Sequence, residues 1–442
     1  MDLKKVIKET EDIDKEYHYF NAINHEPRSG EGKLKNIVIS VKDCICVEGL
    51  ESRAGSRILE GYHPVFDATV IKKIKKEGGT IIGKTAQDAF GFGSFSTNVG
   101  KGMKVPLNPH DKERSCGGSS GGAAGFTKKA PFHHIAIGQS TGGSIVCPAS
   151  FCGVIGLCPT YGRVSRYGLM DYANSLDKIG PLAKSMEDIA LMMEIISGFD
   201  DSESTTLKVD VPKYSDFLKK DIDGLKVGII KEAFGQGIDP QVKDVAEKAI
   251  GCLESRGAKT ETISLPLTQK YGIAAYYLLA MCEASTNLAK YCGMRYGAAE
   301  QIKGSFNEYF SKVRSDFFNN ESKRRIILGT FTRMAGYRDA YYIKAAKVRT
   351  KIIEEYKKAF HKYDILASPT MPFVAPRFDE IKALTPMQNY MADILTVGPN
   401  LAGLPHISIP VGSNEDKMPV GLMLIADHLK EQTLIQVGAK LE

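Results

Sequence analysis

The sequence predicts an α/β protein in which residues 1–442 form one large domain, with a central mixed β-sheet covered by helices on both sides. Short apolar runs of strand type alternate with longer amphipathic runs along most of the chain. Residues 225–265 have the strand, helix and strand pattern of a βαβ unit. No internal repeat or low-complexity linker divides the chain, so a single domain is the simplest interpretation.

The composition is that of a soluble globular protein with a large core, since 43% of the residues are hydrophobic and 25% are charged. The 58 basic and 52 acidic side chains leave a net charge of +6, which is too dilute to indicate a nucleic-acid groove. The N-terminus lacks the apolar stretch of a secretory signal. The longest apolar segment, residues 271–292, contains Glu283, Asn287 and Lys290, which favours a buried helix over a membrane span. We therefore expect a cytoplasmic protein.

The nine cysteines include no Cys-x-x-Cys pair. Cys44 and Cys46, and the group Cys147, Cys152 and Cys158, lack the spacing of zinc ligands and have no nearby histidines. We expect buried, reduced thiols and no metal site.

The N-terminal part predicts a short helical segment, residues 1–30, followed by a strand at residues 35–47 with Lys42 and Asp43 in its middle. A lysine at this place is unusual, because a buried ammonium needs a partner or must lose its proton. The alternative is a lysine on an edge strand whose side chain points to solvent.

Asp67 is the expected N-cap of a helix that stops at Gly78 and Gly79, and residues 80–85 predict a strand. The stretch from Gly78 to Thr85 formally matches the P-loop pattern G-x-x-x-x-G-K-[ST]. A P-loop lies between a strand and a helix, whereas here the helix precedes the strand, so a P-loop nucleotide-binding protein is the disfavoured alternative.

The second half predicts strands at residues 225–231 and 259–265 around a helix at 240–256, then mainly helix from 271 to about 360. Residues 363–368, 404–411 and 419–426 are of strand type, and the last two predict a hairpin.

Two segments rich in glycine and serine, residues 116–123 and 140–145, carry the candidate chemistry. They are either flexible surface loops or a pocket in which backbone N–H groups approach a reacting atom. Gly117 to Gly121 fits the nucleophile elbow G-x-S-x-G, but residues 112–116 make a poor preceding strand, and His361, His406 and His428 lie in no telling motif. A serine nucleophile with a lysine base is the remaining scheme.

That scheme uses Lys42, Ser119 and Ser144, and here the sequence resembles the amidase signature family. The resemblance rests on Lys42 in Val-Lys-Asp, on residues 117–122 and on residues 141–145 followed by Pro148, and it runs from about Asn36 to the C-terminal hairpin. It implies the amidase signature fold and a Ser-cisSer-Lys triad of Ser144, Ser119 and Lys42. Free lysine titrates near 10.4, so Lys42 must be shifted by roughly three units to act as a base near neutral pH.

Glycines in residues 141–145 leave room for converging backbone N–H donors. We expect the N–H groups of Thr141, Gly142, Gly143 and Ser144 to form the oxyanion hole.

Residues 161–169, 175–181 and 323–331 resemble one branch of the family, the glutaminase (A) subunits of tRNA-dependent amidotransferases, and residues 140–143 resemble the archaeal form of that branch. This branch implies glutamine as the substrate, bound by Tyr276, Arg325 and Asp393. It also implies the amidotransferase B subunit as a partner and possibly a small C subunit, with misacylated Glu-tRNA(Gln) or Asp-tRNA(Asn) bound by the complex. No cofactor is expected in this chain, because ATP and Mg would belong to the partner. A free-standing amidase of the same family acting on small or fatty amides is the alternative.

Two positions depart from the family pattern: Ser140 stands where members commonly have Asp, and Val146 where they have Arg. The stretch between the two serine segments also looks one residue longer than usual. The glycine frame favours Ser119 over Ser120 as the bridging serine.

Overall fold

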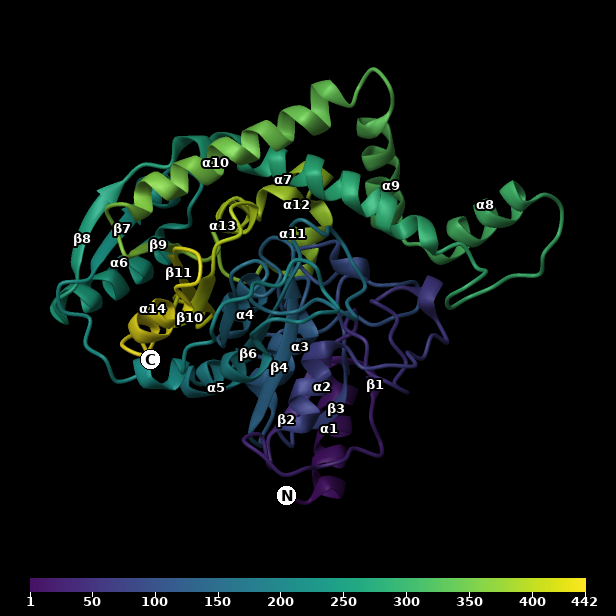
Figure 1. The fold of residues 1–442 in the computed structure, drawn as a ribbon, viewed down its shortest axis with the longest axis horizontal. Coiled ribbons are helices and arrows are strands. Elements are labelled where there is room, and N and C mark those ends of the chain that lie inside the picture. Colours follow the sequence, from purple (N-terminus) through teal and green to yellow (C-terminus); the bar gives the residue numbers. More distant parts are fainter.

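The computed structural model describes residues 1–442, and its framework is a single eleven-stranded mixed sheet (Figure 1). The strand order is β1-β3-β2-β4-β6-β5-β10-β11-β9-β7-β8. The strands are β1 (Phe20–Ile23), β2 (Val38–Lys42), β3 (Thr80–Thr85), β4 (His134–Ser140), β5 (Ile155–Cys158), β6 (Lys178–Ala183), β7 (Lys226–Ile230), β8 (Lys259–Ile263), β9 (Ile365–Pro369), β10 (His406–Ser413) and β11 (Pro419–Ala426).

The helices flank this sheet, and the predicted α/β class is confirmed. They are α1 (Leu3–Tyr17), α2 (Thr69–Lys76), α3 (Gly121–Lys129), α4 (Val146–Cys152), α5 (Met186–Ile196), α6 (Pro240–Ser255), α7 (Pro266–Asn287), α8 (Phe306–Phe317), α9 (Asn320–Arg333), α10 (Lys344–Phe360), α11 (Phe378–Ala383), α12 (Pro386–Met391), α13 (Val397–Leu401) and α14 (Glu431–Gly438). A π-helical turn, Asp339–Ile343, precedes α10.

Both faces of the sheet are buried, as the alternation of side chains along β2 shows. Val38 joins one apolar cluster together with residues of α3 and α4. Ile39 and Val41 join the other cluster, which contains residues of α2 and α5. Successive side chains of a strand point to opposite faces, so a strand that is apolar throughout needs cover on both sides.

The order and direction of the strands place the candidate site at the C-terminal ends of the central strands β2 and β4. β2 runs parallel to both β3 and β4, with Val41 opposite Ile137. Neighbouring parallel strands end at the same edge, so Lys42 at the end of β2 and Ser140 at the end of β4 lie close together. β6 pairs antiparallel with β4 and brings residue 178 opposite Ser140.

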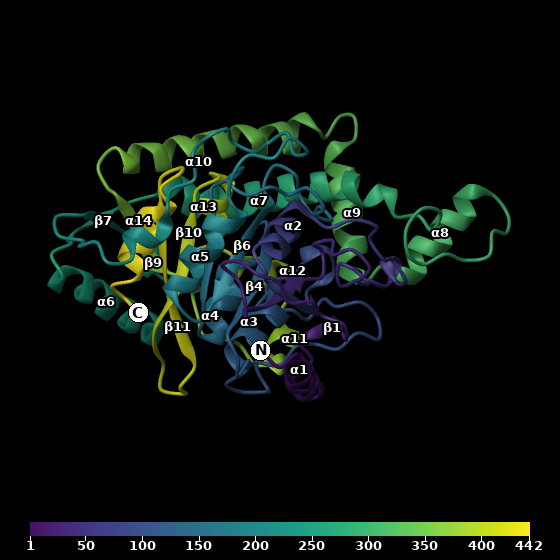
Figure 2. The same cartoon turned by 60° about the horizontal axis from the view of Figure 1, so that its bottom comes forward.

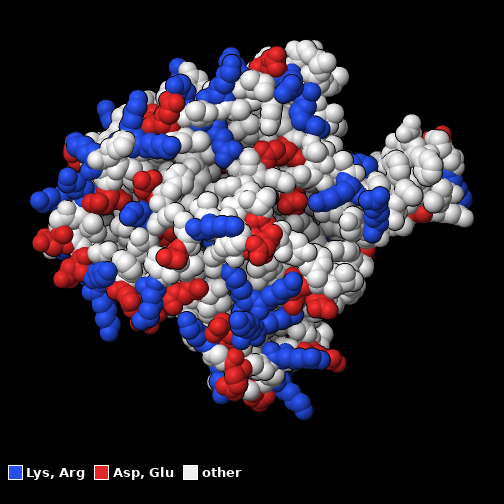
Figure 3. Space-filling model, viewed as in Figure 1, with Lys and Arg blue, Asp and Glu red and all other residues white.

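The long helices form a layer of their own. α7 and α10 lie side by side along one side of the molecule, and α8 projects from the body beyond α9 (Figures 1 and 2). In Figure 2 the β10–β11 hairpin extends to the bottom of the molecule. Basic and acidic side chains are interspersed over the face in Figure 3, in keeping with the mild net charge.

Most of the predicted elements of the second half are confirmed. β7, α6 and β8 form the βαβ unit, with β7 parallel to β8, and residues 266–360 are mainly helical. β10 and β11 form the predicted antiparallel hairpin. In the first half, the strand at residues 80–85 has the predicted bounds. β4 and β6 were not predicted from the sequence, although both are central strands.

Four expectations need correction. The N-terminal helix ends at Tyr17, and residues 20–23 form the edge strand β1, which pairs with β3. The strand predicted at 35–47 is shorter, so Lys42 is its last residue. Asp67 is not a helix cap: Ala68 is the N-cap of α2, and the Asp67 carboxylate accepts hydrogen bonds from Lys75 and from the backbone of Glu48. Seven cysteines are buried, but Cys252 is exposed and Cys292 is half-buried.

None of the helices combines the length and apolar character needed to cross a bilayer. No three His, Cys, Asp or Glu side chains are grouped so that they could hold a metal ion.

Candidate active site

Lys42 lies in the centre of the site, fully buried at the end of β2. Its ammonium nitrogen Nζ is 2.7 Å from Ser119 Oγ, 2.7 Å from the backbone oxygen of Gln139 and 3.0 Å from Gln139 Oε1. The edge-strand alternative is therefore wrong, because this lysine points into the protein. Burial lowers the pKa of Lys42 to about 8, partly offset by the Cys44 thiol and the carboxylates of Asp88 and Asp177.

Ser119 and Ser120 have different partners. The Ser119 hydroxyl lies against Lys42, whereas the Ser120 hydroxyl donates to the backbone oxygen of Gln139 at 3.2 Å. The peptide bond between Gly118 and Ser119 is cis. Both serines directly precede α3, whose early residues are small and buried.

Ser144 lies on the loop that joins β4 to α4, next to the serine pair. The Ser120 backbone N–H donates to the Ser144 carbonyl oxygen at 3.2 Å. Lys42 and Ser119 are fully buried, while Ser144 retains 7% of its surface and its hydroxyl makes no hydrogen bond within the chain. Of the three predicted triad residues, Ser144 is the one whose oxygen is free to meet a substrate.

The loop around Ser144 is closely covered by two side chains. A β-carbon at Gly142 would stand 2.9 Å from the Tyr276 hydroxyl, and one at Gly143 would stand 2.5 Å from Thr396 Oγ1. Only glycine fits at these positions, which brings the backbone of the predicted oxyanion loop against Tyr276.

A buried polar network fixes the start of this loop. Gln139 Nε2 donates to Thr141 Oγ1 at 2.8 Å and to Asp177 Oδ1 at 3.0 Å, and the Thr141 hydroxyl donates to the same Asp177 oxygen at 2.6 Å. The other oxygen of Asp177 accepts the backbone N–H groups of Tyr172 and Ala173. Burial raises the pKa of the Asp177 carboxyl to about 7, although these donors oppose the shift.

Ser140 and Val146 replace a polar pair with local contacts. The Ser140 hydroxyl donates to the Gly142 carbonyl oxygen at 2.8 Å, which holds the loop from within. Val146 is fully buried and belongs to the main apolar cluster. An acidic side chain at 140 without a basic one at 146 would leave a buried charge unpaired, so the two replacements are compatible with each other.

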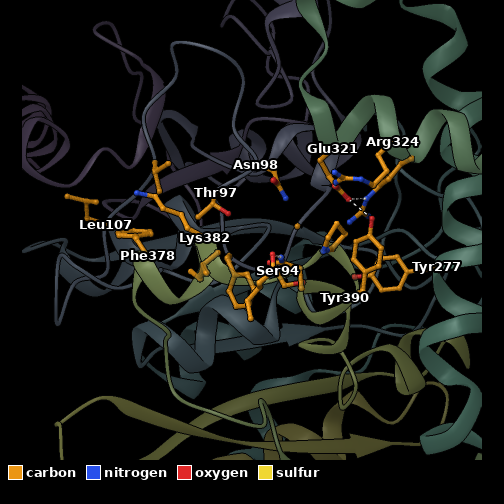
Figure 4. Close-up of a pocket in the computed structure, with 18 residues that line it drawn as sticks. Ser94, Thr97, Asn98, Leu107, Tyr277, Glu321, Arg324, Phe378, Lys382 and Tyr390 are labelled. Atoms are coloured by element: carbon orange, nitrogen blue, oxygen red, sulfur yellow. Dashed lines mark hydrogen bonds and ion pairs between the residues drawn. The ribbon is translucent and has the colours of Figure 1, made fainter.

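A cavity of about 660 Å³ opens beside the site (Figure 4). Its wall includes Tyr277, Glu321 and Tyr390 at one end, Ser94 near the middle, and apolar side chains such as Leu107 and Phe378 at the other end. Arg325 also lines this cavity. Ser144 itself does not line this cavity. Tyr276, which covers Gly142, and Tyr277, which lines the cavity, are neighbours on α7 and connect the two places.

Arg325 is the buried cation of the cavity. Its Nε donates to Glu321 Oε1 at 2.7 Å, and Nη1 donates to the Tyr172 hydroxyl. The guanidinium carbon lies 5.0 to 5.6 Å from the ring centres of Phe92, Tyr172, Tyr277 and Tyr390. This setting keeps the guanidinium in one orientation, with Nη2 left without a partner in the chain.

Asp393 lies behind the same wall. Its carboxylate accepts hydrogen bonds from the Tyr277 hydroxyl at 2.7 Å and from the Ser94 hydroxyl at 2.8 Å. Burial raises the pKa of Asp393, which these two donors and the Arg325 charge oppose. Arg325 and Asp393, which the family resemblance assigns to glutamine binding, thus share the contact residue Tyr277.

The competing schemes find no support. Lys84 of the P-loop pattern is fully buried in β3, and its Nζ donates to the carbonyl oxygens of Ile45 and Asp43 and to Ser52. No strand leads directly into the G-x-S-x-G segment, because the 3-10 turn Ala89–Gly91 and a loop separate it from β3. His406 is buried on β10, where its Nδ1 contacts the Leu404 carbonyl oxygen.

The sequence profile of the amidase family matches residues 4–435. The chain belongs to the amidase family. Among its members, the A subunit of the glutamyl-tRNA(Gln) amidotransferase of Koribacter versatilis is 47% identical over 411 residues, which cover 93% of this chain and 84% of that protein.

Solved structures of the amidase family have the same fold. The crystal structure of the A subunit of glutamyl-tRNA(Gln) amidotransferase from Thermotoga maritima has a TM-score of 0.84 at 37% identity, covering 98% of this chain and 90% of that one. Peptide amidase from Stenotrophomonas maltophilia has a TM-score of 0.73 at 27% identity, covering 93% of this chain and 83% of that one.

Four residues of the site were not predicted from the sequence: Gln139, Tyr172, Asp177 and Glu321.

Proposed function

We propose that this chain is the glutaminase subunit of a tRNA-dependent amidotransferase, which hydrolyses glutamine and supplies the ammonia to a partner subunit. The observation that carries the proposal is the buried Lys42–Ser119 pair beside Ser144, next to a cavity that holds Arg325. The relatives that are A subunits of glutamyl-tRNA(Gln) amidotransferases support the same assignment.

The chemistry follows from the order of the three side chains. Neutral Lys42 takes the proton of Ser119 while Ser119 takes the proton of Ser144, and the Ser144 oxygen attacks the carbon of the glutamine amide. The N–H groups of residues 141–144 stabilise the negative oxygen of the tetrahedral intermediate. The C–N bond then breaks, the proton returns through Ser119 to the leaving ammonia, and water hydrolyses the acyl-serine to glutamate.

The charges at the cavity select a free amino acid. The Arg325 guanidinium binds the α-carboxylate of glutamine, the Asp393 carboxylate binds its α-ammonium, and Tyr276 contacts the substrate beside the oxyanion loop. A fatty amide carries neither charge, so it would leave Arg325 Nη2 unpaired and would gain no ionic contact with Asp393. The free-standing amidase is therefore the weaker alternative.

The remaining steps belong to other chains. The B subunit, with ATP and Mg, would activate the misacylated Glu-tRNA(Gln) or Asp-tRNA(Asn), and a small C subunit would complete a cytoplasmic complex. The relatives' names support a heteromeric enzyme.

The test is glutamine hydrolysis by the chain co-purified with its partner subunits. Ser144→Ala and Ser119→Ala should abolish hydrolysis and labelling by a serine-directed fluorophosphonate, while Ser120→Ala keeps most of both. Full activity in Ser144→Ala would refute the assignment. Strong activity of the isolated wild-type chain on fatty amides, with none on glutamine, would favour the free-standing amidase.

A further inference from the structure

The contacts of the Lys42 side chain determine where its lone pair can point. Three oxygens surround its Nζ: Ser119 Oγ, the Gln139 backbone oxygen and Gln139 Oε1. A lysine ammonium has three N–H bonds and can donate to all three. The neutral amine required of a base has two N–H bonds and a lone pair, so one contact must reverse its direction.

Only one of the three oxygens can make that reversal. A carbonyl and an amide oxygen accept hydrogen bonds but cannot donate, whereas a serine hydroxyl can do both. When both N–H bonds are directed to Gln139, the lone pair faces Ser119. This is the orientation in which Lys42 can remove the Ser119 proton.

We propose that Gln139 is a positioning residue, whose two oxygens hold the N–H bonds of neutral Lys42 and thereby aim its lone pair at Ser119. The inference rests on the proposed function, in which Lys42 is the base.

The orientation of the Gln139 amide is itself fixed. Its Nε2 donates to Thr141 and to the Asp177 carboxylate, so its oxygen must face Lys42. A turn of the amide would set Oε1 against the carboxylate and leave Nε2 without that acceptor. Asp177 therefore acts on Lys42 through Gln139.

Gln139 could affect activity either by orienting the Lys42 lone pair or by shifting the Lys42 pKa. These two roles predict opposite effects on activity when Gln139 is replaced. The titratable groups that influence the pKa of Lys42 are Cys44, Asp88 and Asp177, and all three favour its charged form. Gln139 Oε1 also stabilises the ammonium as an acceptor, so its removal lowers the pKa of Lys42 and increases the neutral fraction. If Gln139 only tuned the pKa, its loss would leave activity unchanged or raise it near neutral pH.

The first variant is Gln139→Met, which keeps the side-chain length and removes the amide. In the complex, we expect the plateau kcat for glutamine to fall about 10- to 100-fold. We also expect the acidic limb of the pH profile to move to lower pH, with the glutamine KM within about twofold.

The second variant, Asp177→Asn, turns the Gln139 amide without removing it. The backbone N–H groups of Tyr172 and Ala173 are fixed donors, so the oxygen of the new carboxamide stays with them and its NH2 faces Gln139. Gln139 must then turn its oxygen away from Lys42 and present Nε2 to it. The amine lone pair is occupied by that donor, and kcat should fall as in Gln139→Met.

The rate of Ser144 labelling is a second measurement, and it can test the role of Gln139 even if the proposed glutaminase function is wrong. The rate of Ser144 labelling by a fluorophosphonate depends on the base and not on recognition of glutamine. Slower labelling in both variants, with cooperative thermal unfolding that begins above the assay temperature, supports the inference even if wild-type protein hydrolyses another amide. Wild-type plateau kcat and labelling rates in either folded variant would overturn it.

Discussion

The Tyr276 hydroxyl lies directly over Gly142, where a β-carbon would stand 2.9 Å from the hydroxyl oxygen and 3.0 Å from Cζ. The tyrosine cannot easily move away, because it is buried and its ring packs edge-on against Tyr277 with centres 4.9 Å apart. The absence of a side chain at residue 142 is thus what lets Tyr276 close over the predicted oxyanion loop.

We predict that Gly142→Ala lowers kcat/KM for glutamine by about 10- to 100-fold, because a shift of a fraction of an ångström misplaces the oxyanion donors. Overpacking should also lower the free energy of unfolding by about 1–3 kcal/mol. Steady-state kinetics and thermal unfolding measure both. The control is Gly251→Ala on α6, where no atom lies within 4 Å of the new methyl group. That variant should keep full activity, and equal activity in Gly142→Ala would contradict the prediction.

The pH dependence of glutamine hydrolysis should follow the charge of Lys42. Its pKa is lowered to about 8 by burial, and the base is the neutral form, so kcat should increase with pH from 6 and level off above about 8. Asp177, with a pKa raised to about 7, makes the lower part of the rise steeper, because its ionised form holds Gln139.

Rate measurements from pH 6 to 9 test this profile, and a flat profile would be incompatible with a lysine base. Lys42→Arg is the matched variant, because an arginine stays charged throughout this range. It should be inactive at every pH.

The sequence allowed the fold class and the three triad candidates to be predicted, but not what surrounds them. The run at residues 35–47 is apolar over most of its length and predicts one long strand. It ends at Lys42 because the Asp43 carboxylate accepts hydrogen bonds from the backbone of Gly55 and Arg53 and so turns the chain. Those partners lie ten and more residues away, and no local pattern identifies them.

Gln139 and Asp177 were missed for a similar reason. They meet because β6 pairs antiparallel with β4 and places Ile179 opposite Gln139. That register depends on the whole sheet. The cavity was also unpredictable, since its wall combines the loop around Ser94 with α9 and α12. The family resemblance suggested Arg325 and Asp393 as substrate contacts. Their common contact with Tyr277 is visible only in the folded chain.

Arg325 should determine how tightly glutamine binds. We predict that Arg325→Lys raises the glutamine KM by about 10-fold or more and changes kcat much less, because an ammonium cannot bind a carboxylate through two N–H groups while it also contacts Glu321 and Tyr172. Lys323→Met on the same helix is the control, since Lys323 has no ion pair and does not line the cavity. If Arg325→Lys impaired only tRNA-dependent steps and left the KM unchanged, the substrate role would be wrong.

Lys84 should matter for stability and not for nucleotide binding. Its buried ammonium donates to two carbonyl oxygens and to Ser52, so it links β3 to the segment that follows β2. We predict that Lys84→Met lowers the free energy of unfolding by about 1–3 kcal/mol, because these buried acceptors lose their donor.

The exposed Lys76 on α2 provides the control: Lys76→Met should change the free energy of unfolding by no more than about 0.5 kcal/mol. Urea unfolding compares the variants, and calorimetry with ATP tests the alternative directly. ATP binding by the isolated wild-type chain that disappears in Lys84→Met would revive the P-loop interpretation. The opposite result is expected, since residues 80–85 are all buried in a paired strand and leave no loop in which phosphates could lie.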